Sequence, residues 1–168
     1  TGGTVSTAGA GSLELGSTVT SLGTFGGTQS TLLFNGSSAQ TINATSVNAG
    51  NLIVNNASGV TLNADITVNA TLTLTSGDIT STSTNKLSLK SSVSGGSSSS
   101  HISGPVDFIA DATNECTIPV GNGTDYTPIK LQRNGGSATT YTAEYTTGTA
   151  AGASLNWNSY PLGLPHSG

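Results

Sequence analysis

The chain of 168 residues has a formal net charge of -4, from four Lys and Arg and eight Asp and Glu, with the basic residues scattered along it. This excludes the basic footprint by which nucleic-acid-binding proteins displace counterions, and no apolar run approaches the ~20 residues that span a bilayer. Ser and Thr make up about a third of the chain, which is typical of low-complexity linkers, but the 33% hydrophobic content is enough to fill a narrow core in one or two folded units.

Residues 1–90 carry an internal repeat of about 20 residues, marked by apolar residues at recurring positions. The strongest series consists of apolar pairs that flank one outward residue, as in a strand with one buried face: Leu13/Leu15, Leu32/Phe34, Leu52/Val54, Leu72/Leu74 and Leu87/Leu89. Two further series have nearly the same period: Leu22, Ile42, Leu62 and Ile79, and more loosely Phe25, Val47 and Val68. Three apolar series at one period predict an all-β fold, a parallel β-helix (solenoid) with about three faces per turn.

The turns between these strands repeat as well. Residues 34–42 align without gaps on residues 54–62, and two Asn pairs then stack: Asn35 over Asn55, and Asn43 over Asn63. Asn tolerates the left-handed backbone conformation that sharp corners require, and stacked Asn side chains can hydrogen-bond along the axis. We therefore expect Asn ladders, with ordinary loop residues as the alternative. The outward positions are small and uncharged and predict a smooth polar wall: Thr71, Thr73, Thr75 and Ser88.

Both ends of such a solenoid expose strand edges, which invite pairing unless they are capped. The segment from Thr1 to Gly11 is mostly Gly, Thr, Ala and Ser and is not a strong cap. We therefore expect more chain, or another subunit, beyond at least one end. The sequence also starts without Met or a signal segment, which suggests a processed product or an excerpt of a longer precursor.

The regular spacing of apolar residues ends after Lys90. Residues 91–100 form a Ser/Gly-rich run that we interpret as a linker or wide loop, and residues 101–168 collect most of the aromatic residues and all five prolines. Short strands separated by turns are expected at 102–106, 108–109, 116–119, 127–132 and 139–147. In the last of these, Tyr141, Ala143 and Tyr145 share one face. This pattern predicts an antiparallel cap or a small β-rich domain at the end of the solenoid.

The second half also contains the tracts SSSSHISGPV (97–106), TIPVGNGTDYTPIKL (117–131) and TAEYTTG (142–148), preceded by the rung-like LTLTSGDIT (72–80). Together they resemble a module of large secreted surface proteins of Bacteroidota, over about residues 50–148. The resemblance implies a cell-surface or secreted location, commonly through the type IX secretion route, and an adhesive or fibre-forming role. The chain departs from the pattern at Asp107 and Phe108, because members often have a basic residue soon after the Gly-Pro.

The chain has few residues of the types that act in catalysis or bind metals. Cys116 has no partner for an internal disulfide and is expected as a small buried residue, with pairing between chains as the alternative. His101 and His166 lack a Ser-His-Asp arrangement and are expected at the surface. The several Cys or His ligands of a zinc site are missing. We expect no catalytic residue, no cofactor and no metal.

Acidic residues offer two weaker alternatives. For calcium, one segment offers side-chain oxygens from Asp107, Asp111, Asn114, Glu115 and Asp125. It has no EF-hand or nonapeptide pattern, so its carboxylates are expected to be solvated loop residues. Polysaccharide-processing enzymes with β-helices collect acids on one outer face, but Glu14, Asp65 and Asp78 occupy different repeat positions. The sequence therefore predicts that the chain is not an enzyme.

The expected function is that of an extracellular structural or adhesive surface protein, whose stacked rungs form a fibre or filament segment. Expected partners are further copies or adjacent segments of the same fibre, and surface glycans. The alternative is a carbohydrate-binding module, in which aromatic side chains stack on sugar rings. The candidates are Trp157, Tyr160 and Tyr145. Core packing explains the same residues equally well. Five Asn-x-Ser/Thr sites are candidates for glycosylation, at about the frequency expected by chance: Asn35, Asn43, Asn56, Asn69 and Asn122.

Overall fold

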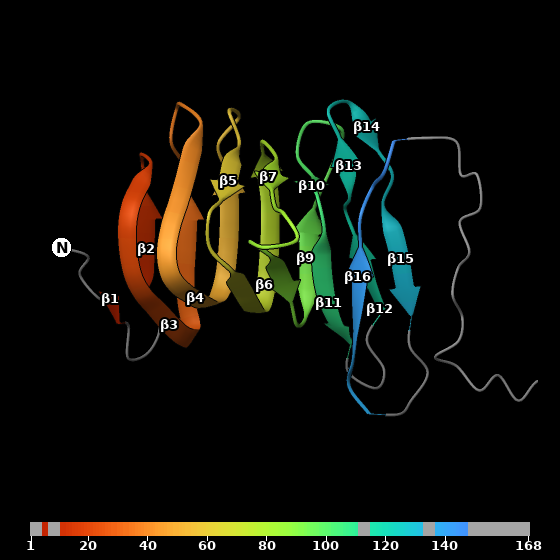
Figure 1. The fold of residues 1–168 in the computed structure, drawn as a ribbon, viewed down its shortest axis with the longest axis horizontal. Helices are drawn as coiled ribbons and strands as arrows, with labels where there is room; N and C mark the ends of the chain where they lie inside the picture. The colour runs from red at the N-terminus through yellow and green to blue at the C-terminus, as the bar shows by residue number, and fades with distance from the viewer. Residues whose placement is uncertain (1–4, 7–10, 111–114, 133–136, 148–168) are drawn as a thin grey trace, which may run out of the picture.

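The computed structural model describes residues 5–6, 11–110, 115–132 and 137–147. Over these residues the chain is all-β and winds into a parallel β-solenoid of about five turns, with small antiparallel sheets. Figure 1 shows the solenoid from the side, with the N-terminal turns on the left and the antiparallel strands on the right. The predicted fold class is confirmed.

Each turn contributes a strand segment to each of three faces. Three long strands run along more than one face: β3 (Val19–Phe34), β4 (Gln40–Asn55) and β6 (Ile66–Ser76). Face 1 begins with β2 (Ser12–Leu15), continues through the ends of the long strands and finishes with β9 (Ser92–Gly95).

The other two faces use the remaining parts of the long strands. Face 2 contains the starts of β3 and β4, followed by β5 (Val60–Leu62), β7 (Ile79–Thr80) and β10 (Ile102–Ser103). Face 3 contains β1 (Val5–Ser6), the middle of β3 and β4, the start of β6, and then β8 (Leu87–Leu89) and β11 (Val106–Ala110).

The parallel register stacks apolar residues directly on one another. On face 1, Leu32 pairs with Leu52, and Leu52 pairs with Leu72. The inward residues of all three faces form one continuous core, and the largest fully buried side chains are Phe25, Phe34, Phe108, Leu32, Ile42, Leu52, Leu62, Ile66, Leu72, Ile79, Leu87 and Leu89. A single rung completes neither its core nor its hydrogen bonds, so each rung depends on its neighbours.

The predicted repeat has the right period but in part the wrong register. The pair Leu87/Leu89 stacks on face 3, where Leu87 pairs with Ile66, whereas Val93 follows Leu72 on face 1. Three more partners lie two residues away from the predicted ones: Leu22 pairs with Ala44, Ile79 with Val60, and Val68 with Ala49. Alternate residues of a strand point to the same side. A shift of two residues therefore keeps the buried side buried, and the apolar pattern does not distinguish these registers.

Glycine, not asparagine, takes the left-handed conformation at the corners. Among the described residues only Gly has a positive φ, including Gly59, Gly77, Gly95 and Gly104. At Gly77, an added Cβ would lie 1.7 Å from the carbonyl oxygen of Asn56, so no larger residue fits that corner without a shift of the backbone. The expectation that Asn residues supply this conformation is wrong.

Parallel stacking continues beyond residue 90, where the sequence predicted the end of the solenoid. Strand β9 pairs with β6, β10 with β7, and β11 with β8, all in parallel. The Ser/Gly-rich run 91–100 therefore contains a strand of face 1 instead of a linker. Within β9 only Val93 packs against the core, which explains why the apolar signal is weak there.

The last turn is wound in the opposite direction. The chain passes β12 (Glu115–Ile118), which lies against β9, and then reverses at the hairpin of β13 (Gly121–Asn122) and β14 (Asp125–Tyr126). After the reversal, β15 (Ile129–Gln132) pairs antiparallel with β12, and β16 (Thr139–Ala143) pairs antiparallel with β11.

The forward turns visit faces 2, 3 and 1 in that order, whereas β14, β15 and β16 return over faces 2, 1 and 3 (Figure 1). We call these three strands the counter-wound cap. Their inward residues extend the core, since Ile129, Leu131 and Tyr141 pack against it and Ala143 is buried. Tyr145 packs against the same core beyond the end of β16. The antiparallel cap that the sequence predicted is thus a final rung with reversed chain direction.

Candidate functional site

Two registered columns of outward side chains consist of small polar residues, whereas the neighbouring column on face 1 contains Glu14, Leu33 and Ile53. On face 2 the column is Thr41, Thr61, Thr80 and Ser103. On face 1 the column is Ser12, Thr31, Asn51, Thr71 and Ser92. The distance between neighbours in a column is set by the ~4.8 Å spacing of paired strands. These columns are therefore regular, uncharged arrays of hydroxyl and amide groups.

Amide groups also connect successive rungs. Asn63 Nδ2 donates to Asn43 Oδ1 at 3.0 Å, which confirms this predicted ladder. Asn35 instead donates to the carboxylate of Glu14, one rung earlier. The Asn side chains on the wall are thus held by partners, which fixes their positions on the surface.

A second amide pair lies inside the corner between faces 1 and 2, and the apolar repeat contains nothing that predicts it. Gln40 and Asn56 are both buried, and Asn56 Nδ2 donates to Gln40 Oε1 at 2.8 Å. Gln40 Nε2 donates to the carbonyl oxygens of Leu15 and Ser17 at 2.8 and 2.9 Å. These bonds satisfy the buried side-chain amides, as buried polar groups require, and connect the corners of three successive turns.

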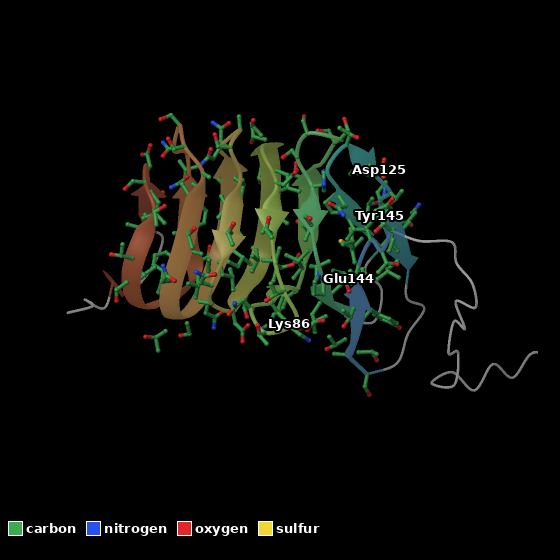
Figure 2. All side chains as sticks on the ribbon, turned by 45° about the horizontal axis from the view of Figure 1, so that its top comes forward. Lys86, Asp125, Glu144 and Tyr145 are labelled. Atoms are coloured by element: carbon green, nitrogen blue, oxygen red, sulfur yellow. The ribbon has the colours of Figure 1, made fainter. Side chains whose placement is uncertain are left out.

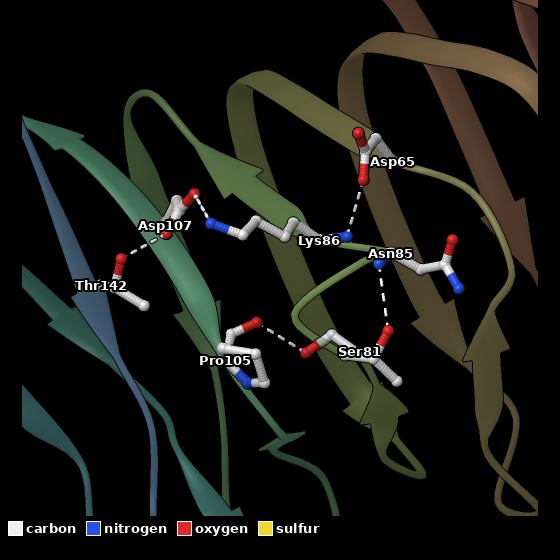
Figure 3. A network of polar contacts seen from close by, with 8 residues as sticks. Asp65, Ser81, Asn85, Lys86, Pro105, Asp107 and Thr142 are labelled. Atoms are coloured by element: carbon white, nitrogen blue, oxygen red, sulfur yellow. Dashed lines mark hydrogen bonds and ion pairs between the residues drawn. The ribbon is translucent and has the colours of Figure 1, made fainter.

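Polar contacts on face 3 connect the solenoid to the cap (Figure 3). The backbone N–H of Lys86 donates to Asp65 Oδ1 at 2.8 Å, and Lys86 Nζ lies 3.1 Å from Asp107 Oδ2. Asp107 Oδ1 accepts a hydrogen bond of 2.6 Å from Thr142 Oγ1 of β16. The side chains of Lys86 and Asp107 are 39% and 14% exposed, so solvent screens the ion pair and it contributes about 1 kcal/mol or less. Asp107 is therefore a strand residue in an ion pair, and not the solvated loop carboxylate that the sequence favoured.

Beside these contacts lies a hollow of about 560 Å³ that we call the hydroxyl-lined hollow. Its lining includes Ser81, Thr82, Lys86, Pro105, Thr142 and Glu144. Figure 2 places Lys86 and Glu144 at the junction of the solenoid and the cap. The sequence analysis missed this group because its members come from two forward rungs and the returning strand, far apart in the chain.

A second hollow, of about 340 Å³, lies at the corner before face 2. It is lined by residues 57–61, Asp78 and Gly123 of the reversing hairpin, among others. Most of its lining is polar, and Asp78 supplies a carboxylate. Neither hollow contains an aromatic platform among the lining residues.

His101 is fully buried, so the expectation of a surface histidine is wrong. Its Nδ1 lies 3.1 Å from Asp78 Oδ1, and its backbone N–H donates to the same oxygen at 3.0 Å. Within the described part of the chain, His101 Nε2 is the buried side-chain nitrogen without a hydrogen-bond partner. The hairpin covers the ring closely, because a Cβ added to Gly121 would lie 2.7 Å from His101 Cδ2.

Cys116 is a free, buried thiol, as predicted. Burial raises the pKa of this thiol, and a hydrogen bond with the backbone of Val93 partly offsets the effect. The neutral thiol is the form that the core favours. This makes Cys116 a packing residue of β12, the forward strand that pairs with β15 of the cap.

Of the three aromatic residues predicted as a sugar platform, the structure describes Tyr145. Its hydroxyl donates to Asp125 Oδ2 at 2.9 Å, and this hydrogen bond raises the pKa of Tyr145. Figure 2 shows both residues at the cap. The contact connects the end of the cap to β14, so Tyr145 supports the packing interpretation of this residue. Trp157, Tyr160 and His166 lie outside the described residues.

The five predicted glycosylation sites differ in access. Asn56 is buried and Asn35, Asn43 and Asn69 donate hydrogen bonds: Asn35 to Glu14, Asn43 to the Val19 carbonyl, and Asn69 to Asn48. Asn122 is exposed in the reversing hairpin. Asn122 is therefore the candidate whose side chain is most accessible.

The acidic residues considered for calcium or catalysis are dispersed. The described residues contain no group of three or more His, Cys, Asp and Glu side chains that could hold a metal ion. Glu115 lies 2.7 Å from Lys130 in an exposed ion pair, while Asp111 and Asn114 lie outside the described residues. Glu14 is on face 1, whereas Asp65 and Asp78 precede strands of faces 3 and 2.

The comparisons with known proteins add no relative. No family model matches the chain, and no curated protein and no solved structure matches it. In the described part, no helix is long and apolar enough to cross a membrane. The class that the fold defines is the parallel β-solenoid with a counter-wound cap.

Proposed function

We propose that the chain is a structural segment of an extracellular surface protein, in which stacked rungs form a stiff support for adhesion. The observation that carries the proposal is the registered wall, whose columns of Ser, Thr and Asn repeat from rung to rung around a continuous apolar core. In the part of the chain that the structure describes, no group of three or more His, Cys, Asp and Glu side chains could hold a metal ion. The rigidity of the wall follows from stacking, because every inner rung is paired on both sides.

The Bacteroidota resemblance supports the extracellular part of the proposal. Residues 97–106 contain β10 and the first residue of β11, residues 117–131 contain the reversing hairpin and most of β15, and residues 142–147 contain the end of β16. Secretion by the type IX route is part of the proposal on the same basis.

Assembly into a fibre is supported by strand edges. Among the described residues, β2 pairs with β3 alone, so its other edge has free backbone donors and acceptors. An adjacent segment or a further copy would continue face 1 beyond β2. At the opposite end the outermost strands are the antiparallel β15 and β16, so the two ends of the solenoid are chemically different.

The test is to locate the protein in the cells that produce it and to image it. Antibodies against the purified chain are expected to label intact cells, and labelling only after permeabilisation would contradict the proposal. Negative-stain electron microscopy, with the intact mass of the same material, separates the two forms of the idea. Filaments of a small subunit indicate self-assembly, whereas thin rods from a much larger chain indicate a segment of an adhesin.

Carbohydrate binding is the second candidate function, and the hydroxyl-lined hollow favours it. A glycan array probed with the whole chain, followed by Glu144→Ala, would test the hollow. Glu115→Ala is the control, because it removes another exposed acid, one that pairs with Lys130 and does not line the hollow. Loss of binding in the first variant alone supports a site there. For the predicted aromatic platform, Trp157→Ala with an intact fold and lost binding supports the platform, whereas unfolding supports core packing.

A further inference from the structure

We infer that Asn122 is a site of spontaneous covalent change, at which the reversing hairpin converts its asparagine to aspartate and isoaspartate. Asn122 ends β13 and Asp125 begins β14, so Gly123 and Thr124 form the two-residue loop between them (Figure 1). Gly123 has φ +61, and no described residue other than Gly has a positive φ. Positive φ at the first loop position alone is the type II′ arrangement.

The chemistry requires the backbone nitrogen after the asparagine to reach its side-chain carbonyl carbon. The nitrogen of Gly123 forms a bond to Cγ of Asn122, and the bond between Cγ and Nδ2 breaks. Nδ2 leaves as ammonia, with the proton that Gly123 N gives up, and a five-membered succinimide remains. Water then opens the ring at either carbonyl, which gives aspartate or isoaspartate. The net reaction consumes one water molecule and releases one ammonia molecule, and it needs no oxidant or reductant.

The local structure leaves both reacting groups available. Asn122 and Gly123 are exposed, and a Cβ at Gly123 would meet nothing within 4 Å, so no side chain crowds the nitrogen. In the described part of the chain, no hydrogen bond engages the Asn122 amide or the Gly123 N–H outside the hairpin ladder. The absence of a Cβ on Gly123 also lowers the steric barrier to ring closure.

The same chain contains a protected counterpart, Asn35-Gly36. The Asn35 amide donates to the carboxylate of Glu14, and Gly36 N donates to Gln40 Oε1 at 2.9 Å. Gly36 is buried. Hydrogen bonds thus hold both the amide of Asn35, which would leave, and the backbone nitrogen of Gly36, which would attack. The third Asn-Gly sequence, Asn134-Gly135, lies outside the described residues.

Conversion would weaken the cap where it begins. Asn122 pairs directly with Asp125 across the hairpin, so an aspartate at this position places two carboxylates opposite each other. Like charges at directly opposed positions destabilise a strand pair. Isoaspartate also adds a carbon to the backbone of a loop of minimal length. The hairpin covers His101, so loosening it exposes the end of the solenoid core.

The test is to age the purified whole chain at mildly alkaline pH and to map its tryptic peptides by mass. Cleavage at Lys86, Lys90, Lys130 and Arg133 places the three Asn-Gly sequences in separate peptides. We expect deamidation at Asn122 to be several-fold faster than at Asn35 in the folded chain, and the two rates to converge in denaturant. Equal rates in the folded chain, or no conversion at Asn122, would overturn the inference.

Two further measurements make the test specific. Asn122→Gln removes the five-membered ring closure and is expected to abolish conversion in its peptide while the fold is kept. Asn122→Asp is expected to increase hydrogen exchange in β14–β16 and to leave β4–β8 unchanged. Unaltered exchange in the cap would contradict the weakening. A glycan on Asn122 Nδ2 in native material would also overturn the inference, because it replaces the free amide that the chemistry needs.

Discussion

Leu52 occupies the middle of the face 1 stack, and its truncation tests the stacking directly. It pairs with Leu32 on one side and Leu72 on the other, and it is 1% exposed. Leu52→Ala removes most of a fully buried side chain from a column whose neighbours are fixed by backbone pairing on both sides. The void has little freedom to close, because both adjoining rungs would have to move together.

The expected cost follows from this environment. Leu-to-Ala changes in cores cost about 2–5 kcal/mol, and the larger values belong to sites that collapse least. We therefore expect Leu52→Ala to lower the free energy of unfolding by about 4 kcal/mol. The matched control is Ile53→Ala, the next residue of the same strand, which points outward and is half-buried. Its cost is expected to be about 1 kcal/mol or less.

Urea denaturation followed by far-ultraviolet circular dichroism measures both variants. The comparison rests on the transition midpoint, with the slope of unfolding free energy against urea unchanged. A loss below about 1 kcal/mol for Leu52→Ala, or equal losses for the two variants, would refute the reasoning. Either result would mean that the core does not hold the rungs in the described register.

Three other predictions address the corner, the cap and pH. Gly77→Ala should cost more than the ~1–2 kcal/mol of a left-handed Ala, and clearly more in thermal melts than Gly123→Ala, where φ is also positive but the added Cβ meets nothing. Lys86→Met should lower the free energy of unfolding by about 1 kcal/mol or less, and this difference should disappear in high salt. A large loss of stability that does not depend on salt would disprove that solvent screens the ion pair with Asp107. Burial raises the pKa of Cys116 in the folded chain above its ordinary 9.0. The folded state therefore keeps the full contribution of the neutral thiol to stability below pH 9.0, and loses it as pH rises through the pKa of the folded chain. Unfolding free energies on both sides of 9.0 should show this decline in the parent chain and a smaller one in Cys116→Ala, and identical profiles would contradict it.

The solenoid was predictable because its signal is periodic. Leu13, Leu32, Leu52 and Leu72 recur at nearly constant spacing and stack in one column. Register was less predictable, because a strand that slips by two residues buries the same side. The pair Leu87/Leu89 shows a second cause of error, since the same Leu-x-Leu pattern that marks face 1 in earlier rungs lies on face 3 in this rung, where Leu87 pairs with Ile66.

The predicted boundary at residue 90 shows a different weakness of composition. Ser92 and Ser94 resemble linker residues, but both are exposed positions of β9, where a small polar side chain is as suitable as threonine. His101 was misjudged for a related reason. His101 directly precedes Ile102, which points inward, so a residue at this position of an inner rung would face solvent. In this rung the reversing hairpin covers the His101 ring. Contacts made by a chain that reverses direction have no periodic signal.

The reversal at Asn122 and Asp125 makes the two ends of the solenoid unequal, and this bears on assembly. Beyond β2, an added strand can continue face 1 in the parallel direction of all the forward rungs. Beyond β15, an added strand meets a chain that runs the opposite way, so a copy stacked there in the same orientation must pair antiparallel. A head-to-tail fibre therefore needs an antiparallel joint at every subunit boundary, whereas a longer chain that ends in this cap needs none. The second arrangement leaves every rung pairing parallel up to the cap.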